Sequence, residues 1–184
     1  STRKESSAAS DVYKRQHIYI IFMTIYALSS GPGLSGLAVI RVSGEGALNI
    51  IQKITNEEIP TSRVATLRNI RKFGSDEIID RGIILWFPGP GSYTGEDLIE
   101  LHIHGSLAVI NEIQNTLSKF ENCRLAEPGE FTKLAFQNGK INLLEAESIG
   151  DLISAETEIQ RRQAIDIMSG CLLYTSPSPR DLST

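Results

Sequence analysis

Residues 99–104 constrain the fold more than any other stretch, because apolar and polar side chains alternate there without a break. The apolar set is Ile99, Leu101 and Ile103, and the polar set is Glu100, His102 and His104. Side chains two residues apart on a strand lie on the same face of a sheet. The segment therefore predicts a strand with one buried face, whose other face lines a ligand site or meets solvent.

The rest of the chain mixes strand and helix patterns in no regular order. Strands are predicted at residues 24–28, 37–42, 64–73, 81–87, 97–104 and 124–126. Helices are predicted at residues 43–53, 107–120, 131–137 and 142–168. Because these elements do not alternate as a strand–helix repeat, the fold class that we expect is α+β, with a mixed sheet and flanking helices.

The last predicted helix is long for the small domain that precedes it. It opens at Asn142, with Glu145 three residues later, which is the arrangement of a capping box. Apolar residues then continue at helical spacing towards Met168. We therefore expect the first long helix of a truncated helical domain over residues 142–170, after a domain over residues 23–141.

Both ends of the chain have a composition unlike its middle. Residues 1–16 are polar, patternless and rich in serine, and residues 174–184 are rich in serine and proline. Both resemble translated adapter sequence, so we expect non-native tails over residues 1–22 and 171–184 and a natural start at Met23; natural disordered tails are the alternative. The apolar run at residues 18–22 is too short to cross a bilayer, so no membrane association is expected.

Composition restricts the partners of this chain. Its 184 residues carry a formal net charge of −4, which argues against a surface that is basic throughout and coats nucleic acid. The two cysteines, Cys123 and Cys171, lie far apart and lack the spacing of metal ligands. They indicate a reduced, intracellular protein, and we expect a cytoplasmic one.

Arg41 is the first candidate site residue, because it interrupts an otherwise apolar strand. An arginine in such a run needs a partner or must reach solvent past its stem. It either faces an edge of the sheet or donates in bidentate fashion to a carboxylate or a polar ring. Glu100 is expected to be its partner or to share a ligand with it.

Lys140 and the two histidines are further candidates. Lys140 follows Asn138 and Gly139 at a turn where two predicted helix ends meet, which is a favourable place for an anion, although turn lysines are usually solvated. His102 and His104 lack a third ligand for a metal, so their face is a ligand wall or a solvated surface. No metal site, no nucleophile and no catalytic residue is assigned.

The loop at residues 86–97 joins two predicted strands and carries several prolines and glycines. It is either an exposed connection or a lid or subunit contact beside the ligand wall.

Several motifs occur together and in one order between residues 23 and 170. They are Thr24-Ile-Tyr-Ala, Gly36-Leu-Ala-Val-Ile-Arg-Val-Ser-Gly44, Leu85-Trp-Phe-Pro-Gly-Pro, Ser92-Tyr-Thr-Gly-Glu-Asp97, Glu100-Leu-His-Ile-His-Gly105, Pro128-Gly-Glu-Phe131 and Ala135-Phe-Gln-Asn-Gly-Lys-Ile-Asn-Leu143. In this combination the chain resembles the N-terminal part of the MnmE/TrmE family of tRNA modification GTPases.

The resemblance implies a folate-binding domain similar to that of the glycine-cleavage aminomethyltransferases. Such a domain binds 5-formyl- or 5,10-methylene-tetrahydrofolate as a one-carbon donor, and it forms a homodimer. Carried over residue by residue, the folate contacts fall on Arg41, Glu100 and Lys140.

The resemblance also implies partners for the intact protein. An MnmG-like FAD protein and tRNA join it in modifying carbon 5 of the wobble uridine. GTP, magnesium and potassium belong to a G domain that this sequence lacks, so the chain as given is not expected to hydrolyse GTP. The alternatives are a stand-alone folate-dependent one-carbon transferase and a ligand-free dimerisation module.

Overall fold

The computed structural model describes residues 23–31 and 33–169. The chain divides into two compact units, one extending to Phe131 and the other beginning at Thr132. The sequence-based boundary at residue 142 coincides with the N-cap of a helix inside the second unit. The two predicted tails, residues 1–22 and 171–184, fall outside the described residues.

The first unit is built on one mixed sheet of six strands. These are β1 (Thr24–Leu28), β2 (Ser35–Ser43), β3 (Thr66–Arg71), β4 (Ile78–Phe87), β5 (Leu98–Gly105) and β6 (Cys123–Leu125). Their order across the sheet is β3-β4-β5-β2-β1-β6, and β1 with β6 is the parallel pair. The predicted α+β class with a mixed sheet is confirmed, and every predicted strand is found near its predicted position.

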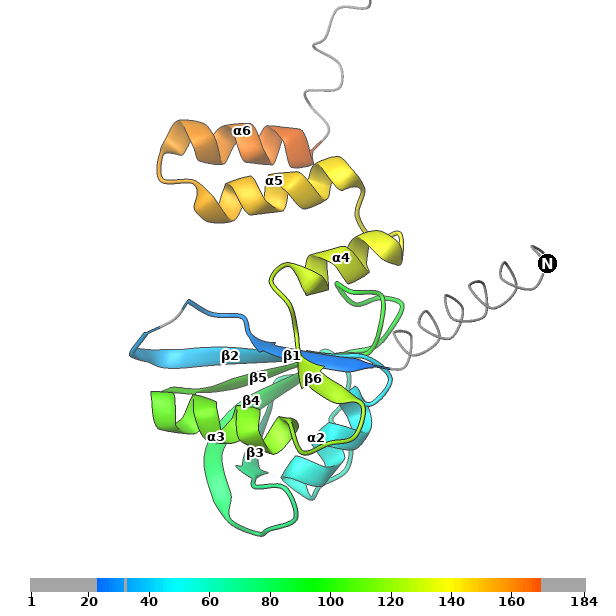
Figure 1. Cartoon of the computed structure of the whole chain (residues 1–184), viewed down its shortest axis with the longest axis vertical. Coiled ribbons are helices and arrows are strands. Elements are labelled where there is room, and N and C mark those ends of the chain that lie inside the picture. The colour runs from blue at the N-terminus through cyan, green and yellow to red at the C-terminus, as the bar shows by residue number, and fades with distance from the viewer. Residues whose placement is uncertain (1–22, 32, 170–184) are drawn as a thin grey trace, which may run out of the picture. The chain divides into compact units, whose positions relative to one another are not determined.

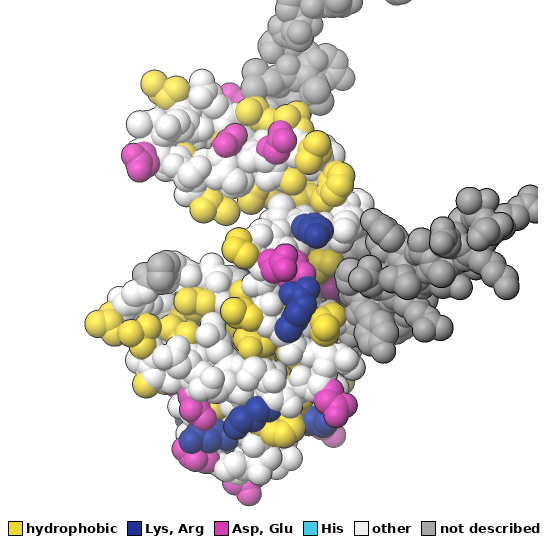
Figure 2. Space-filling model, viewed as in Figure 1, with side chains coloured by type: hydrophobic (Ala, Val, Ile, Leu, Met, Phe, Trp, Pro, Cys, Tyr) yellow, Lys and Arg dark blue, Asp and Glu magenta, His cyan; other side chains and the backbone are white. Residues whose placement is uncertain are grey.

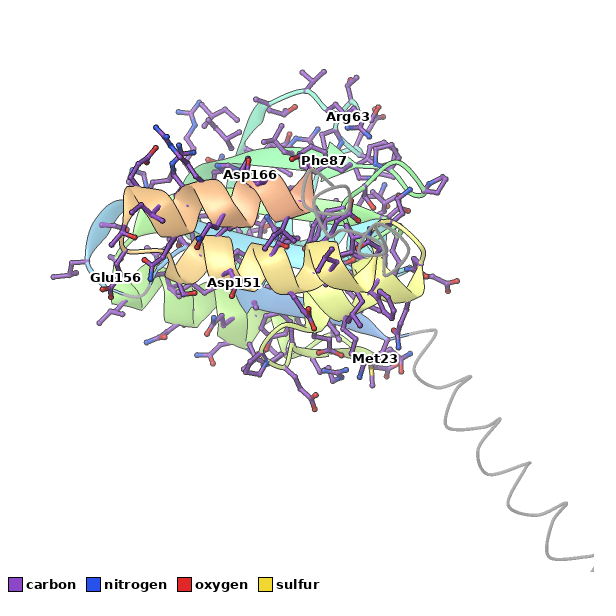
Figure 3. All side chains as sticks on the ribbon, turned by 90° about the horizontal axis from the view of Figure 1, so that it is seen from above. Met23, Arg63, Phe87, Asp151, Glu156 and Asp166 are labelled. Carbon is purple, nitrogen blue, oxygen red and sulfur yellow. The ribbon has the colours of Figure 1, made fainter. Side chains whose placement is uncertain are left out.

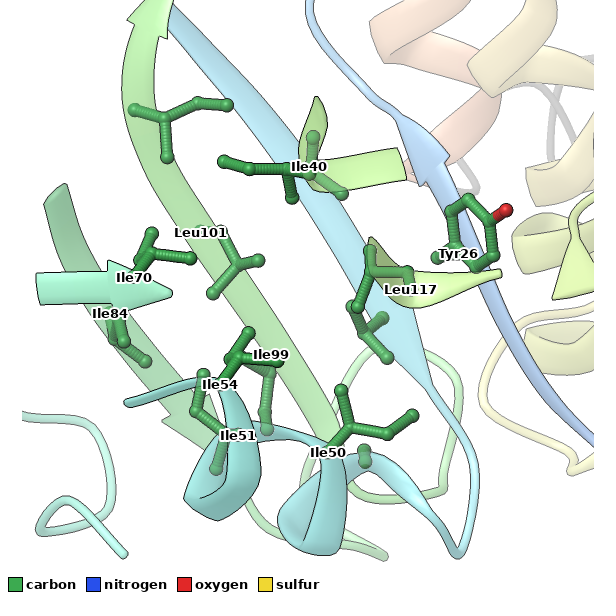
Figure 4. Close-up of a cluster of buried hydrophobic side chains, with 14 of the residues drawn as sticks. Tyr26, Ile40, Ile50, Ile51, Ile54, Ile70, Ile84, Ile99, Leu101 and Leu117 are labelled. Carbon is green, nitrogen blue, oxygen red and sulfur yellow. The ribbon is translucent and has the colours of Figure 1, made fainter. Parts of the chain in front are cut away.

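Helices α2 (Ala47–Thr55) and α3 (Leu107–Leu117) cover the same face of this sheet (Figure 1). The core lies between them and the sheet, and isoleucine and leucine side chains from both layers meet there (Figure 4). Ile99, Leu101 and Ile103 are each at most 1% exposed, which confirms the predicted apolar face of the fifth strand. The polar side chains that alternate with them therefore lie on the opposite face.

Helix α4 (Glu130–Gln137) begins at the end of the first unit and continues into the second, which also holds α5 (Leu143–Ser154) and α6 (Glu158–Met168). Helices α5 and α6 pack side by side (Figures 1 and 3). The Asn142 side chain accepts a hydrogen bond from the backbone N–H of Glu145, and the Glu145 side chain accepts one from the Asn142 N–H. The predicted capping box is therefore confirmed.

The prediction of one long helix over residues 142–168 is wrong. The backbone is extended at Ala155, with φ −67° and ψ 121°, and a new helix starts after Thr157. Thr157 and Gln160 form a second capping box, in which each side chain accepts from the other residue's backbone N–H. This local alternative for the backbone ends the first helix, although apolar residues continue at helical spacing across the break.

No helix within the described residues is both long enough and apolar enough to cross a membrane.

Candidate functional site

Arg41 and Glu100 lie on the face of the sheet that α2 and α3 leave uncovered. They are directly opposed in the antiparallel pair of β2 and β5. The same row continues to Ala27 on β1 and Leu85 on β4. Directly opposed residues point to the same side of a sheet, so this row forms a strip of polar and apolar groups across four strands.

The Arg41 guanidinium donates twice to one oxygen of Glu100. Its Nε lies 3.1 Å and its Nη2 2.8 Å from Glu100 Oε1. The other carboxylate oxygen, Oε2, lies 3.2 Å from Nε2 of His102. The side chains of Arg41 and Glu100 are 29% and 17% exposed, so a ligand can reach a pair that is already partly withdrawn from water. The predicted partnership between these two residues is confirmed.

Two aromatic rings flank the same guanidinium. The Arg41 Cζ atom lies 5.8 Å from the ring centroid of Tyr93 and 5.8 Å from that of Phe131. A cation over an aromatic face at this distance is attracted by the ring quadrupole. The site thus combines charged donors, a carboxylate and flat apolar surfaces, a combination that suits a planar heterocycle with polar edges.

The two histidines have different surroundings. His102 joins the Arg41–Glu100 pair, whereas His104 is 72% exposed and its Nδ1 lies 2.8 Å from Oδ1 of Asp80. Burial opposes ionisation of Asp80, but hydrogen bonds from the backbone and ring of His104 and from the backbone of Arg81 outweigh burial and lower the pKa of that carboxyl. Among residues 23–31 and 33–169, no group of three His, Cys, Asp or Glu side chains is arranged to hold a metal ion.

Lys140 is exposed and belongs to the second unit. It follows Gly139, whose φ is +66°, and its backbone N–H donates to the carbonyl of Ala135 over 2.8 Å. The N–H of Gly139 donates to the carbonyl of Phe136, so the two bonds form a Schellman motif that ends α4. The sheet brings Arg41 and Glu100 together; the participation of Lys140 in the same site stays a prediction.

The loop between β4 and β5 is tied down at both sides of its base. Arg63 donates from its backbone to the Trp86 carbonyl over 2.7 Å and from Nη2 to the Gly91 carbonyl over 2.6 Å. Its guanidinium also lies 5.8 Å from the ring centroid of Phe87, beside it in Figure 3. Asp97 Oδ1 accepts from Nε1 of Trp86 and from the backbone N–H of Gly89, which anchors the other side.

Three residues that the sequence reasoning did not single out lie beside the Arg41 row. The Ser43 hydroxyl, two residues after Arg41 on β2, lies 2.7 Å from the hydroxyl of Thr94 and donates to Glu96 Oε2 over 3.2 Å. Burial raises the pKa of Glu96, the negative charge of Glu45 adds to this, and the Ser43 hydrogen bond opposes it. The sequence could have identified Ser43 as a residue beside the site, because it is two residues after Arg41 and residues i and i+2 of a strand share a face.

A sequence model described as GTP-binding protein TrmE N-terminus matches residues 24–140. The chain belongs to this family. The matched region covers the whole sheet, Arg41, Glu100 and the turn at Lys140, and the predicted resemblance to the N-terminal part of the MnmE/TrmE family is confirmed.

Curated relatives agree with this assignment. The chain is 68% identical over 148 residues to the tRNA modification GTPase MnmE of Pelagibacter ubique, a match covering 80% of this chain and 33% of the relative. It is 51% identical over 149 residues to the mitochondrial 5-taurinomethyluridine-tRNA synthase subunit GTPB3 of Danio rerio, covering 81% of this chain and 30% of the relative. The human mitochondrial GTPB3 is 49% identical over 148 residues, covering 80% and 30%. The chain therefore spans about a third of the length of these relatives.

Proposed function

We propose that this chain is the folate-binding and dimerising part of a tRNA modification GTPase. It holds 5-formyl- or 5,10-methylene-tetrahydrofolate as a one-carbon donor for modification of wobble uridine at carbon 5. The observation that carries the proposal is the Arg41–Glu100 pair, partly buried on an open sheet face and flanked by the rings of Tyr93 and Phe131.

The roles of the two residues follow from their chemistry. A pterin presents N–H donors along one edge, and a carboxylate oxygen accepts from such a donor. This is the role of Glu100 through Oε2, because its Oε1 already accepts twice from Arg41. Arg41 already uses Nε and Nη2 on Glu100, so its Nη1 is the donor offered to a carbonyl of the ligand. The aromatic rings beside it supply flat surface for stacking.

Lys140 completes the proposed set by offering an ammonium to an anionic group of the folate, such as a carboxylate of its glutamate tail. The Schellman motif fixes the backbone at this position while leaving the side chain exposed. A lysine on a fixed turn brings charge to a ligand at a lower entropic cost than one on a loose loop.

The open face of the sheet also supports the proposed homodimer. Leu67 on β3 is directly opposed to Ile83 on β4, and Ile83 to His102 on β5. Leu67 is 55% and Ile83 41% exposed, and Figure 2 shows further hydrophobic side chains at the surface towards one end of β2. A second copy of the chain would cover this apolar row next to the Arg41 site.

The activity of the whole protein belongs to the same proposal. The Pelagibacter ubique relative is named a tRNA modification GTPase, and the Danio rerio relative a 5-taurinomethyluridine-tRNA synthase subunit. The intact form of this chain would act on tRNA with an MnmG-like FAD protein in the cytoplasm. GTP, magnesium and potassium would bind a G domain beyond this sequence. Within the first unit, basic and acidic side chains of the described residues are interspersed on the face drawn in Figure 2, which does not favour a continuous basic track for an RNA backbone there.

Isothermal titration with 5-formyltetrahydrofolate tests the ligand. The parent should bind, Lys140→Ala should bind at least several-fold more weakly, and Lys119→Ala, an exposed lysine just after α3, should bind like the parent. If millimolar ligand gives no heat above the dilution blank, folate binding is excluded, and the ligand-free dimerisation module is the remaining alternative. A Lys140→Ala variant that binds as tightly as the parent would remove that lysine from the site.

Sedimentation equilibrium tests the dimer separately. Ile83→Glu, which places a charge on the apolar row, should shift the parent dimer towards monomer. Leu107→Glu is the matched control, because this exposed residue begins α3 on the other face of the sheet. Equal association constants for the two variants would exclude the open face as the interface.

A further inference from the structure

The turn at residues 92–97 is held by a closed ring of hydrogen bonds that stands directly beside the Arg41 row. The backbone N–H of Glu96 donates to Thr94 Oγ1 over 3.4 Å, and Thr94 Oγ1 lies 2.7 Å from Ser43 Oγ. The Ser43 hydroxyl then donates to Glu96 Oε2 over 3.2 Å. The Glu96 carboxylate can only accept, so it fixes one direction of donation around the ring, from Thr94 to Ser43 to Glu96.

The ring joins this turn to the rigid part of the sheet. Ser43 and Thr94 are both 0% exposed, and Ser43 is directly opposed to Leu98 on β5. A buried hydroxyl that lost its partner would carry the full cost of desolvation. The turn therefore cannot separate from β2 without a substantial loss of stability. Ser43 also lies on the same face of β2 as Arg41, so the contact between the turn and the sheet is next to the proposed folate site.

The turn has a second set of constraints of its own. The backbone N–H of Gly95 donates to Ser92 Oγ over 3.0 Å, and Ser92 Oγ in turn donates to the carbonyl of Glu96. Gly95 has a φ of +83°, a conformation that glycine adopts without strain. With Arg63 and Asp97 anchoring the base of the loop, Tyr93 is presented from a preformed turn and its ring meets the Arg41 guanidinium.

We propose that Tyr93 is a wall of the ligand site that stacks on a flat ring of the folate, and that Glu96, acting through Ser43 and Thr94, positions it. This inference rests on the folate-binding function proposed above. It assigns the loop between β4 and β5 a role as a fixed surface of the site. Glu96 is a positioning residue, whose carboxyl acts on the ligand through the turn that carries Tyr93.

The stacking role follows from geometry and from ligand chemistry. The folate carries a pterin and a p-aminobenzoyl ring, both flat and both able to stack on a phenol face. A wall that is already fixed before binding loses little conformational entropy when the ligand arrives. Loss of the Tyr93 side-chain ring should therefore weaken ligand binding. Loss of the hydrogen bonds among Ser43, Thr94 and Glu96 should also weaken binding, because the Tyr93 ring could then move.

Two pairs of variants test the inference, with 5-formyltetrahydrofolate as the probe in isothermal titration. Tyr93→Leu should weaken binding about tenfold and Tyr93→Phe by less than about threefold, because phenylalanine keeps the ring. Glu96→Ala should also weaken binding, whereas Glu96→Gln, which keeps an acceptor for Ser43, should restore most of the affinity. Rescue by glutamine separates positioning by hydrogen bonding from a requirement for the negative charge itself.

Trp86, the single tryptophan of the chain, reports on the turn without any ligand. Its Nε1 donates to Asp97, next to Glu96, so acrylamide should quench its fluorescence more strongly in Glu96→Ala than in the parent or in Glu96→Gln. Unchanged quenching in Glu96→Ala would overturn the positioning role. A Tyr93→Leu variant that binds the ligand as tightly as the parent would exclude stacking of the ligand on Tyr93. Absence of binding by the parent itself would instead overturn the folate proposal, and the ligand role of Tyr93 with it.

Discussion

Arg41 and Glu100 face one another across β2 and β5, 59 residues apart in sequence, and both arginine donors reach the same carboxylate oxygen. This one-sided arrangement directs the second oxygen of Glu100 towards His102. A fork-to-fork pair would use both oxygens of the carboxylate on the arginine. Here the pair is held together and still presents an acceptor and a donor to a ligand.

Arg41→Lys should therefore weaken the site while preserving its charge. Lysine lacks the planar fork and the stacking surface between Tyr93 and Phe131, so the affinity for 5-formyltetrahydrofolate should fall roughly tenfold. The free energy of unfolding should fall by less than about 1 kcal/mol, because the ion pair is partly exposed. Calorimetric titration and urea denaturation give the two numbers, and equal affinity for both proteins would contradict the assigned role of the guanidinium.

Gly82 should be intolerant of a side chain for a reason that lies in the backbone of the next strand. A Cβ at this position of β4 would lie 2.4 Å from the carbonyl oxygen of His102. Gly82→Ala should destabilise the protein by roughly 1–3 kcal/mol, because a backbone oxygen in a sheet cannot move aside. Gly36→Ala on β2, where nothing lies within 4 Å, should change stability by less than about 0.5 kcal/mol. Denaturant midpoints of the two variants that coincide would contradict the close approach of β4 and β5.

Cys123 should be a poor nucleophile in the folded protein. Burial raises the pKa of its thiol to about 11, so the thiol stays protonated at pH 8 and becomes a thiolate only as the pH approaches that value. Alkylation by iodoacetamide at pH 8 should be about 100-fold slower than for the same residue in an unfolded chain. Mass spectrometry of the Cys123 peptide, labelled with and without guanidinium chloride, measures the ratio. Equal labelling rates would show that the thiol is not withdrawn from solvent.

Thr157 should determine where α6 begins. Its side chain accepts from the backbone N–H of Gln160, and an N-cap of this kind contributes about 1 kcal/mol. Thr157→Ala should accelerate hydrogen exchange of the amides in residues 158–168 by about fivefold, since 1 kcal/mol corresponds to that factor. Thr157→Ser keeps the hydroxyl and should exchange like the parent. A variant lacking the hydroxyl with unchanged protection would exclude the cap as the cause of the helix break.

Features that depend on the spacing of apolar and polar residues along one strand could be predicted from the sequence. Alternation at residues 99–104 identified both the buried and the polar face of β5, and an arginine inside an apolar strand indicated that Arg41 needed a partner. Because a strand fixes which residues share a face, the choice of Glu100 followed from little more than pattern.

The missed features depend on competition or on the folded path of a loop. Apolar residues keep helical spacing across residues 155–157, so the pattern predicts a continuous helix there. The capping box of Thr157 and Gln160 starts a new helix instead, and apolar spacing does not reveal this break. Glu96 and Thr94 meet Ser43 more than 50 residues away through a turn whose shape depends on Gly95, Ser92 and Arg63 together. No spacing rule relates such positions before the loop has folded.

Calorimetric titration of 5-formyltetrahydrofolate into the parent and into Glu100→Gln is the sharpest test of folate binding at the Arg41–Glu100 pair. Glutamine has nearly the same shape as glutamate, but it offers a single acceptor oxygen and an amide donor in place of a paired acceptor without a donor. We expect measurable binding by the parent and a loss of about tenfold or more in Glu100→Gln, with both proteins folded by circular dichroism. Equal affinities, or no binding by the folded parent, would contradict this expectation.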